Sequence, residues 1–103
     1  MVRALMAAVF GAVLTSPPVA AADIDVGRQR AAQCASCHGV DGRSPVPNYP
    51  NLAGQNALYI QYALKLYRDE ARTGGLAGLM HVQAAPLTDE DIANLAVYFG
   101  SLD

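Results

Sequence analysis

The segment Cys34-Ala35-Ser36-Cys37-His38 constrains this chain more than any other part of its sequence. Two cysteines three positions apart, followed at once by a histidine, form the attachment signature of a c-type haem. This spacing puts the two thiols about one helical turn apart, so both can reach the vinyl groups of one porphyrin. The histidine then supplies the proximal ligand of the iron. Because a haem brings redox chemistry that no natural side chain supplies, the motif indicates electron transfer.

A redox-active dithiol and a zinc site are the two other uses of a Cys-x-x-Cys pair. A thioredoxin-like dithiol sits in a βαβ pattern, and no such pattern surrounds Cys34 and Cys37. A zinc site built from these two cysteines with His38 and His81 requires the adjacent Cys37 and His38 to chelate together, unlike the spacing of zinc fingers. The sequence therefore favours the haem over both alternatives.

The first 22 residues have the features of an export signal. Arg3 gives a positive start, Ala4 to Leu14 is an uncharged apolar run, and Thr15 to Pro18 break it. Small residues for signal peptidase follow at Val19 to Ala22, so we expect cleavage after Ala21 or Ala22. The apolar run is shorter than the roughly 20 residues of a membrane-spanning helix. We therefore expect a cleaved signal peptide over 1–22, a domain over 23–103, periplasmic localisation and no stable membrane insertion.

Size and charge narrow the function further. A mature chain of about 80 residues makes one small domain, and a core of that size needs a staple such as a buried, covalently held haem. The full chain has a formal net charge of −2, and losing Arg3 makes it more acidic. The basic patch of a nucleic-acid-binding protein is absent, so we expect no nucleic-acid partner.

The predicted elements are helices joined by long irregular segments. The first helix runs from about Asp25 through Gln33 into the cysteine motif, with Asp23 or Asp25 as N-cap. Glycine and proline punctuate residues 39–55 too densely for a helix or a central strand. A loop of that length in a small domain needs an object to wrap around, and a haem is one.

Two more helices are predicted in the second half of the chain. Apolar residues at spacings of three and four predict a helix from Asn56 to about Arg72. A second loop then runs from Gly74 through Met80 to Pro86. Thr88 caps the last helix, whose expected buried stripe is Ile92, Leu95, Ala96, Phe99 and Leu102. Strand signals are weak throughout, so we predict an all-α protein.

Met80 is the strongest candidate for the second axial ligand of the iron. It is the only methionine outside the predicted signal peptide. A thioether favours ferrous iron and raises the reduction potential relative to ligation by two histidines. His81 is the competing ligand and would give a haem of lower potential. Since neighbouring residues rarely reach the same metal, only one of the two is expected to bind.

The chain from Gly27 to Leu102 resembles the class I c-type cytochromes, especially the small bacterial branch with cytochromes c553 and the single domains of cytochrome c4. The matching segments are Cys34 to Gly39 with Asp41-Gly42, Pro50 to Gln55, the second-helix residues Tyr59, Leu64, Tyr67, Arg68 and Arg72, the loop residues Met80, Ala84 and Leu87, and Thr88 to Phe99. Ala63 and Glu70 depart from the pattern, where Gln and Gly are more usual.

This resemblance implies a small cytochrome c fold, with three main helices and long loops around one covalently bound haem c. It implies covalent attachment at Cys34 and Cys37 and axial ligation by His38 and Met80. The Pro50 carbonyl is expected to accept a hydrogen bond from His38 and so to orient it. Gly27 is expected to let the first helix approach the last closely, near Tyr98.

The function expected from residues and resemblance together is a monohaem electron carrier, not an enzyme. Because both axial positions are filled, the iron binds no substrate. The monomer takes electrons from a donor protein and passes them to an acceptor protein in transient complexes. Two alternatives stay open. In the first alternative, the chain is a haem c subunit of a periplasmic dehydrogenase or oxidase complex. In the second, it is a haem sensor or enzyme with an open iron site.

Overall fold

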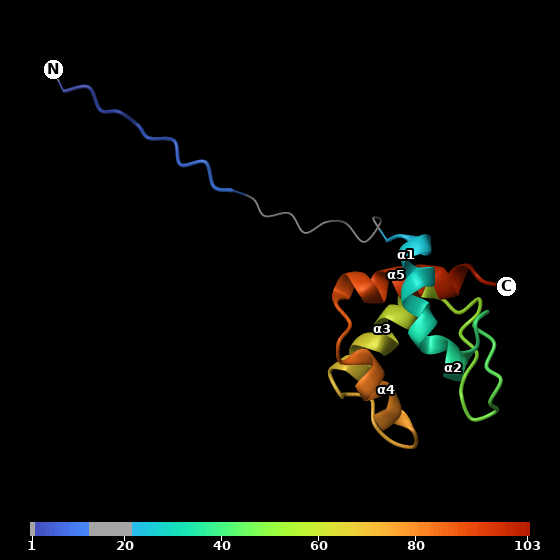
Figure 1. The fold of residues 1–103 in the computed structure, drawn as a ribbon. Helices are drawn as coiled ribbons and strands as arrows, with labels where there is room; N and C mark the ends of the chain where they lie inside the picture. Colours follow the sequence, from blue (N-terminus) through green and yellow to red (C-terminus); the bar gives the residue numbers. More distant parts are fainter. Residues whose placement is uncertain (1, 13–21) are drawn as a thin grey trace.

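The computed structural model of the protein describes residues 2–12 and 22–103 (Figure 1). Residues 2–12 form neither helix nor strand, and the apolar side chains of Leu5 and Phe10 are 97% and 95% exposed. The predicted break at Thr15 to Pro18 and the cleavage segment from Val19 to Ala21 lie outside the described residues. The described ranges contain helices and no strand, which confirms the all-α prediction.

The first helix begins where the sequence predicts. Asp23 caps α1 (Ile24–Arg30), because its carboxylate accepts from the backbone N–H groups of Asp25 and Val26. A 3₁₀ segment, η2 (Ala31–Cys34), follows directly and leads into the short helix α2 (Ala35–His38). The attachment motif therefore lies on a continuous helical path. Gly39, with a φ of 84°, ends that path.

The second helix, α3 (Ala57–Arg68), begins after the predicted cap Asn56 and ends four residues before the predicted Arg72. Glu70 causes the earlier end because it has a φ of 56°, in the left-handed region. The Ala71 N–H donates to the Leu66 carbonyl at 2.8 Å, and the Glu70 N–H donates to the Tyr67 carbonyl at 3.1 Å. These two bonds make a Schellman motif with glutamate at the position that glycine usually takes.

The predicted loop from Gly74 to Pro86 is wrong in its centre, where the structure has a helix, α4 (Ala77–Ala84). Its residues are mostly good helix formers, with Gly78 as the one weak position. Gly74 and Gly75 suggested a loop, but they form the turn just before this helix, with φ values of 94° and 50°. Met80 therefore lies on a helix, not in a loop.

The last helix, α5 (Asp89–Ser101), carries most of the core. Thr88 and Asp91 form a capping box, in which each side chain accepts from the other residue's N–H. The predicted stripe is confirmed at Ile92, Leu95, Ala96 and Phe99, which are buried, with Leu102 half-buried. Asn94 is buried as well, and its side-chain oxygen accepts from the Asp23 N–H at 2.8 Å.

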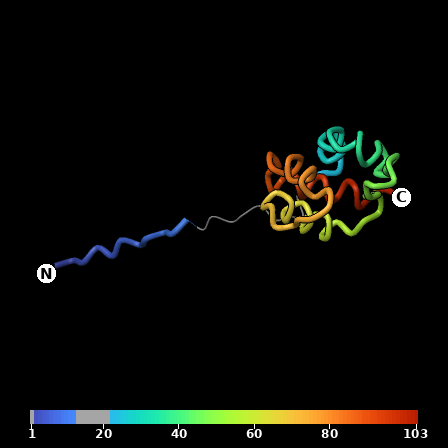
Figure 2. Tube along the Cα trace, turned by 90° about the horizontal axis from the view of Figure 1, so that it is seen from below, coloured from blue at the N-terminus to red at the C-terminus, as the bar shows by residue number. Residues whose placement is uncertain are grey.

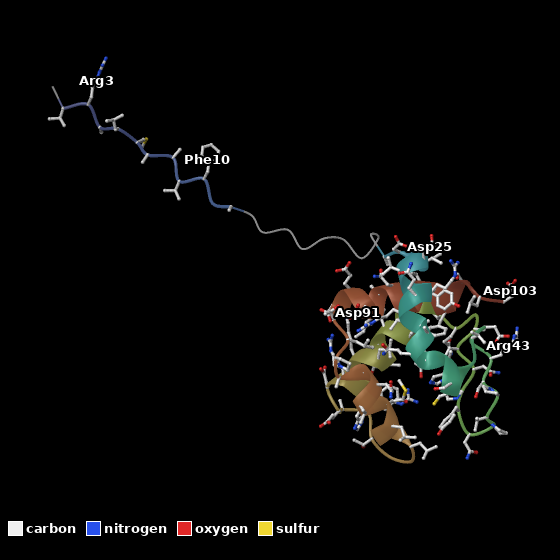
Figure 3. The ribbon with its side chains drawn as sticks, in the orientation of Figure 1. Arg3, Phe10, Asp25, Arg43, Asp91 and Asp103 are labelled. Carbon is white, nitrogen blue, oxygen red and sulfur yellow. The ribbon has the colours of Figure 1, made fainter. Side chains whose placement is uncertain are left out.

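Helix α5 is the common partner of α1 and α3, and α3 also packs against α4 (Figure 1). At the crossing with α1, a Cβ built on Gly27 would overlap the Asn94 carbonyl oxygen and lie 2.8 Å from Tyr98 Cβ, so the expected close approach is confirmed. Figure 2 shows residues 39–55 and α4 on opposite sides of the helical body. The labelled charged residues of this body, such as Asp25, Arg43 and Asp91, lie on its outside (Figure 3).

Candidate haem site

A cavity of about 750 Å³ lies between the attachment motif and helices α3 and α4. Such a volume falls within the usual range for sites that hold a small molecule or cofactor. All five predicted site residues line it, namely Cys34, Cys37, His38, Pro50 and Met80. The structure thus brings together residues that are as far apart in sequence as 34 and 80.

The two cysteines lie at one wall of the cavity as free thiols, both half-buried. Cys34 ends η2 and Cys37 lies in α2, so the tight 3₁₀ turn and the following helical turn set their separation. Burial raises the pKa of the Cys34 thiol, with a smaller opposing effect from the charge of Arg30 and a small further increase from Cys37. Redox-active thiols have lowered pKa values. The environment of Cys34 is therefore unlike that of a redox-active dithiol.

His38 is buried, with only 7% of its surface exposed, and a hydrogen bond to Pro50 fixes its orientation. Its Nδ1 lies 2.8 Å from the Pro50 carbonyl oxygen. Because a carbonyl only accepts, Nδ1 carries the proton and donates it. In a neutral imidazole this leaves the lone pair on Nε2, which is the nitrogen available to a metal.

The loop of residues 39–55 holds Pro50 in place through backbone bonds. The Gly42 carbonyl accepts from the N–H groups of Leu52 at 2.7 Å and Ala53 at 3.0 Å. Ser44 ties the loop to the attachment motif, since its hydroxyl donates to the Cys37 carbonyl at 2.9 Å. These hydrogen bonds hold the loop of residues 39–55 against the segment that carries His38.

Met80 lines the cavity from α4, while its neighbour His81 does not line it. The His81 Nε2 instead lies 2.6 Å from the Arg72 carbonyl oxygen and donates to it. The imidazole of His81 therefore already has a protein partner, the main chain of Arg72, whose residue lines the cavity. The described residues contain no group of three or more His, Cys, Asp or Glu side chains placed to hold a metal ion by themselves.

The remaining walls are mostly apolar, and sequence reasoning assigned few of these residues to the site. The buried floor comes from α3 and α5, with Ile60, Ala63, Leu95 and Phe99. Leu76 and Leu79 line the α4 side, and Tyr49 lines the loop side with its ring centroid 6.5 Å from that of His38. The helical periodicity marks Ile60 and Leu95 as core, but only the fold shows that this core faces a cavity.

The residues present fit a haem. Two thiols and an imidazole stand at one wall, a thioether approaches from another element, and the surface between them is apolar and partly buried. A flat, hydrophobic macrocycle with a central iron needs these donors and this lining. No helix in the described ranges is long and apolar enough to cross a membrane.

Comparison with known proteins shows the family to which the chain belongs. The sequence profile of the family described as Cytochrome c matches residues 24–103. Cytochrome c-554(548) of Halomonas halodenitrificans is 47% identical over 81 residues, which are 79% of this chain and 98% of that protein. Cytochrome c4 of Pseudomonas aeruginosa is 42% identical over 89 residues, which are 85% of this chain and 42% of that protein.

A solved structure supports the fold as well. The crystal structure of reduced recombinant cytochrome c4 from Pseudomonas stutzeri matches with a TM-score of 0.66 and 34% identity, covering 81% of this chain and 47% of that one. The chain thus spans about half the length of the cytochromes c4 that it matches. The chain belongs to the cytochrome c family, whose cofactor is covalently bound haem c, and its function is electron transport.

Proposed function

We propose that this chain is an exported, periplasmic monohaem electron carrier, with residues 1–22 as a cleaved signal peptide and residues 23–103 as the cytochrome domain. Cys34 and Cys37 hold the haem covalently, and His38 and Met80 are the axial ligands of its iron. Pro50 orients His38. When bound, the haem supplies a one-electron ferric–ferrous couple, and the electron comes from one protein partner and goes to another.

The bond from His38 Nδ1 to the Pro50 carbonyl, 2.8 Å long, is the observation that supports this ligand set most strongly. It leaves Nε2 as the free nitrogen of a histidine that lines the same cavity as Met80. The hydrogen bond also makes the imidazole a stronger electron donor to a metal. With both axial positions filled by the protein, the iron exchanges electrons and binds no substrate.

The protein's own residues set the conditions for that electron exchange. Ile60, Leu95 and Phe99 give the bound haem a buried, apolar floor with no side-chain group that would hydrogen-bond to water. A low-dielectric surrounding disfavours the additional positive charge of ferric iron. A thioether ligand acts in the same direction, so we expect a potential above that of a haem with two histidine ligands.

The proposed export rests on the leader and on how its residues lie. The charged start and the apolar run that ends at Leu14 fit a secretory signal. Leu5 and Phe10 are almost fully exposed, so they contribute nothing to the hydrophobic core. Intact-mass measurement of the exported protein tests this proposal. A mature chain that begins at Ala22 or Asp23 supports it, and a retained leader contradicts it.

Absorption spectroscopy of the purified holo-protein tests the ligand set. A bond between a thioether sulfur and ferric iron gives a weak charge-transfer band at the red end of the visible spectrum, and we expect this band in the ferric protein. Substitution Met80→Ala is expected to abolish it. If the ferric protein lacks the band and the ferrous protein binds carbon monoxide rapidly at neutral pH, the open-site alternative replaces this proposal.

One relative favours a second candidate function, that of a fixed subunit in a larger complex with a dehydrogenase. The thiosulfate dehydrogenase electron acceptor of Thiomonas intermedia is 35% identical over 68 residues, which are 66% of this chain and 31% of that protein. Size-exclusion chromatography of native material separates the two functions. A free carrier elutes as a monomer, whereas a complex subunit elutes in a stable larger assembly.

A further inference from the structure

A hydrogen bond joins the residue next to Met80 to the segment that follows α3. His81 donates from Nε2 to the main-chain carbonyl of Arg72 over 2.6 Å. The His81 ring also lies beside Tyr67 of α3, with the ring centroids 6.3 Å apart. The Arg72 guanidinium lies over the same Tyr67 ring, 4.9 Å from its centroid. The three side chains thus gather where α4 meets the end of α3.

Helix α4 depends on its contacts with α3, this hydrogen bond among them, because its own sequence stabilises it little. It has only eight residues, its N-cap Leu76 makes no side-chain capping bond, and Ala84 is its one fully buried residue. Gly78 lowers its intrinsic stability further. Isolated helices shorter than about 12 residues are marginal in water, so contacts with the rest of the protein decide how α4 sits.

The direction of His81 determines the direction of Met80. Successive residues of an α-helix are rotated by about 100° around its axis. When His81 faces the Arg72 carbonyl, Met80 faces the neighbouring sector, which is the cavity. A rotation of α4 that brought His81 to the cavity would break the bond to Arg72 and turn Met80 away.

We propose that His81 is a positioning residue for Met80, acting through its hydrogen bond to the Arg72 carbonyl. This bond sets the rotation of α4 and keeps the thioether of Met80 directed into the cavity. The inference rests on the proposed function, because it assigns His81 a role only if Met80 is the axial ligand. His81 is thus a second contributor to the axial site, although it does not bind the iron.

Imidazole binding to the ferric holo-protein tests this role, since added imidazole reaches the iron only when Met80 has left it. Three variants separate the possible contributions. His81→Phe keeps a ring beside Tyr67 and removes the donor, His81→Gln keeps an N–H donor at similar reach, and Arg72→Gln removes the guanidinium and keeps the carbonyl. We expect His81→Phe to bind imidazole about fivefold more tightly than wild type, the effect of losing one ordinary hydrogen bond.

His81→Gln and Arg72→Gln are expected to stay within about twofold of wild type, as they retain the bond. If His81→Phe binds imidazole like wild type, the positioning role is refuted while the thioether band of wild type still supports Met80 as the ligand. If His81→Gln or Arg72→Gln weakens the site as much as His81→Phe, the hydrogen bond is not the cause. If wild type lacks the thioether band, the axial assignment itself fails.

A measurement on unmodified protein covers the case in which His81→Phe does not fold. Nitrogen-15 NMR of the reduced holo-protein reports which ring nitrogen of His81 carries the proton. We expect the proton on Nε2, exchanging slowly with water because it is hydrogen-bonded. A proton on Nδ1 alone, or an Nε2 proton in rapid exchange, contradicts the proposal.

Discussion

Replacing glycine by alanine at two helical positions is expected to change the stability of this protein in opposite directions. In a helix with free space, the change Gly→Ala stabilises by about 1 kcal/mol. Gly78 of α4 has such space, since a Cβ built there meets nothing within 4 Å. Gly78→Ala should therefore raise the free energy of unfolding by about 1 kcal/mol, which is about 5 °C in Tm for a domain of this size.

Gly27→Ala makes the same chemical change where there is no space. The added Cβ overlaps the Asn94 main-chain carbonyl and lies 2.8 Å from Tyr98 Cβ, so neither neighbour can rotate away. Helices α1 and α5 must then separate along a contact that includes the bond from the Asp23 N–H to Asn94. Overpacking of this kind costs about 1–3 kcal/mol. We expect a net loss of about 2 kcal/mol and a fall in Tm of about 10 °C.

Thermal and urea unfolding of the ferric holo-proteins measures both changes, with covalent haem content matched between samples. The pair controls for the alanine itself, because both substitutions add one methyl group inside a helix. The reasoning is refuted if Gly27→Ala is as stable as wild type or more so. It is equally refuted if Gly78→Ala and Gly27→Ala shift the unfolding transition in the same direction.

Three further predictions concern single residues. Glu70→Gly should stabilise by about 1 kcal/mol in urea unfolding, because it relieves the left-handed backbone of the α3 end, whereas Glu70→Ala keeps that backbone and should show no gain. Thr88→Ala should cost about 1 kcal/mol by removing the cap of α5. The hydrogen bond from the Thr88 N–H, together with smaller effects of the Thr88 hydroxyl and Arg30, holds the pKa of Asp91 below its ordinary value, despite some opposing desolvation. The stability that this carboxylate contributes is therefore present above about pH 4 and is lost as the pH falls through the lowered pKa. Asp91→Asn should flatten the acid limb of a plot of unfolding free energy against pH, and an unchanged limb would contradict this reasoning.

Local signals predicted the parts of the fold that local chemistry controls. Asp23, Asn56 and Thr88 cap their helices because side-chain oxygens satisfy free N–H groups within three residues. The buried stripe of α5 follows from helical periodicity alone. The crossing at Gly27 came from the family resemblance, since nothing in the local sequence names Asn94 and Tyr98 as its neighbours.

The predicted helix boundaries were wrong where glycine or glutamate has a backbone role that its residue type does not indicate. Gly74 and Gly75 indicated a loop through Met80. They lie instead just before the helix α4, whose position depends on contacts with α3. Glu70 adopts a left-handed backbone that single-sequence propensity does not favour, so α3 ends before Arg72. The cavity itself was anticipated only through Cys34, His38 and Met80. Its walls depend on tertiary packing, which brings Tyr49 and Leu95 to the same space.

The central claim is that His38 and Met80 are the two axial ligands of one haem site. The most direct test is NMR of the reduced holo-protein, without residues 1–22 and with carbon-13-labelled methionine methyl groups. Met80 is the one methionine left after removal of residues 1–22, so a single signal is expected. A methyl group bound through sulfur to the iron lies over the centre of the macrocycle, whose ring current shifts its proton signal far upfield. We predict that shifted signal for Met80. A Met80 methyl signal at the position of an ordinary methionine would contradict the account.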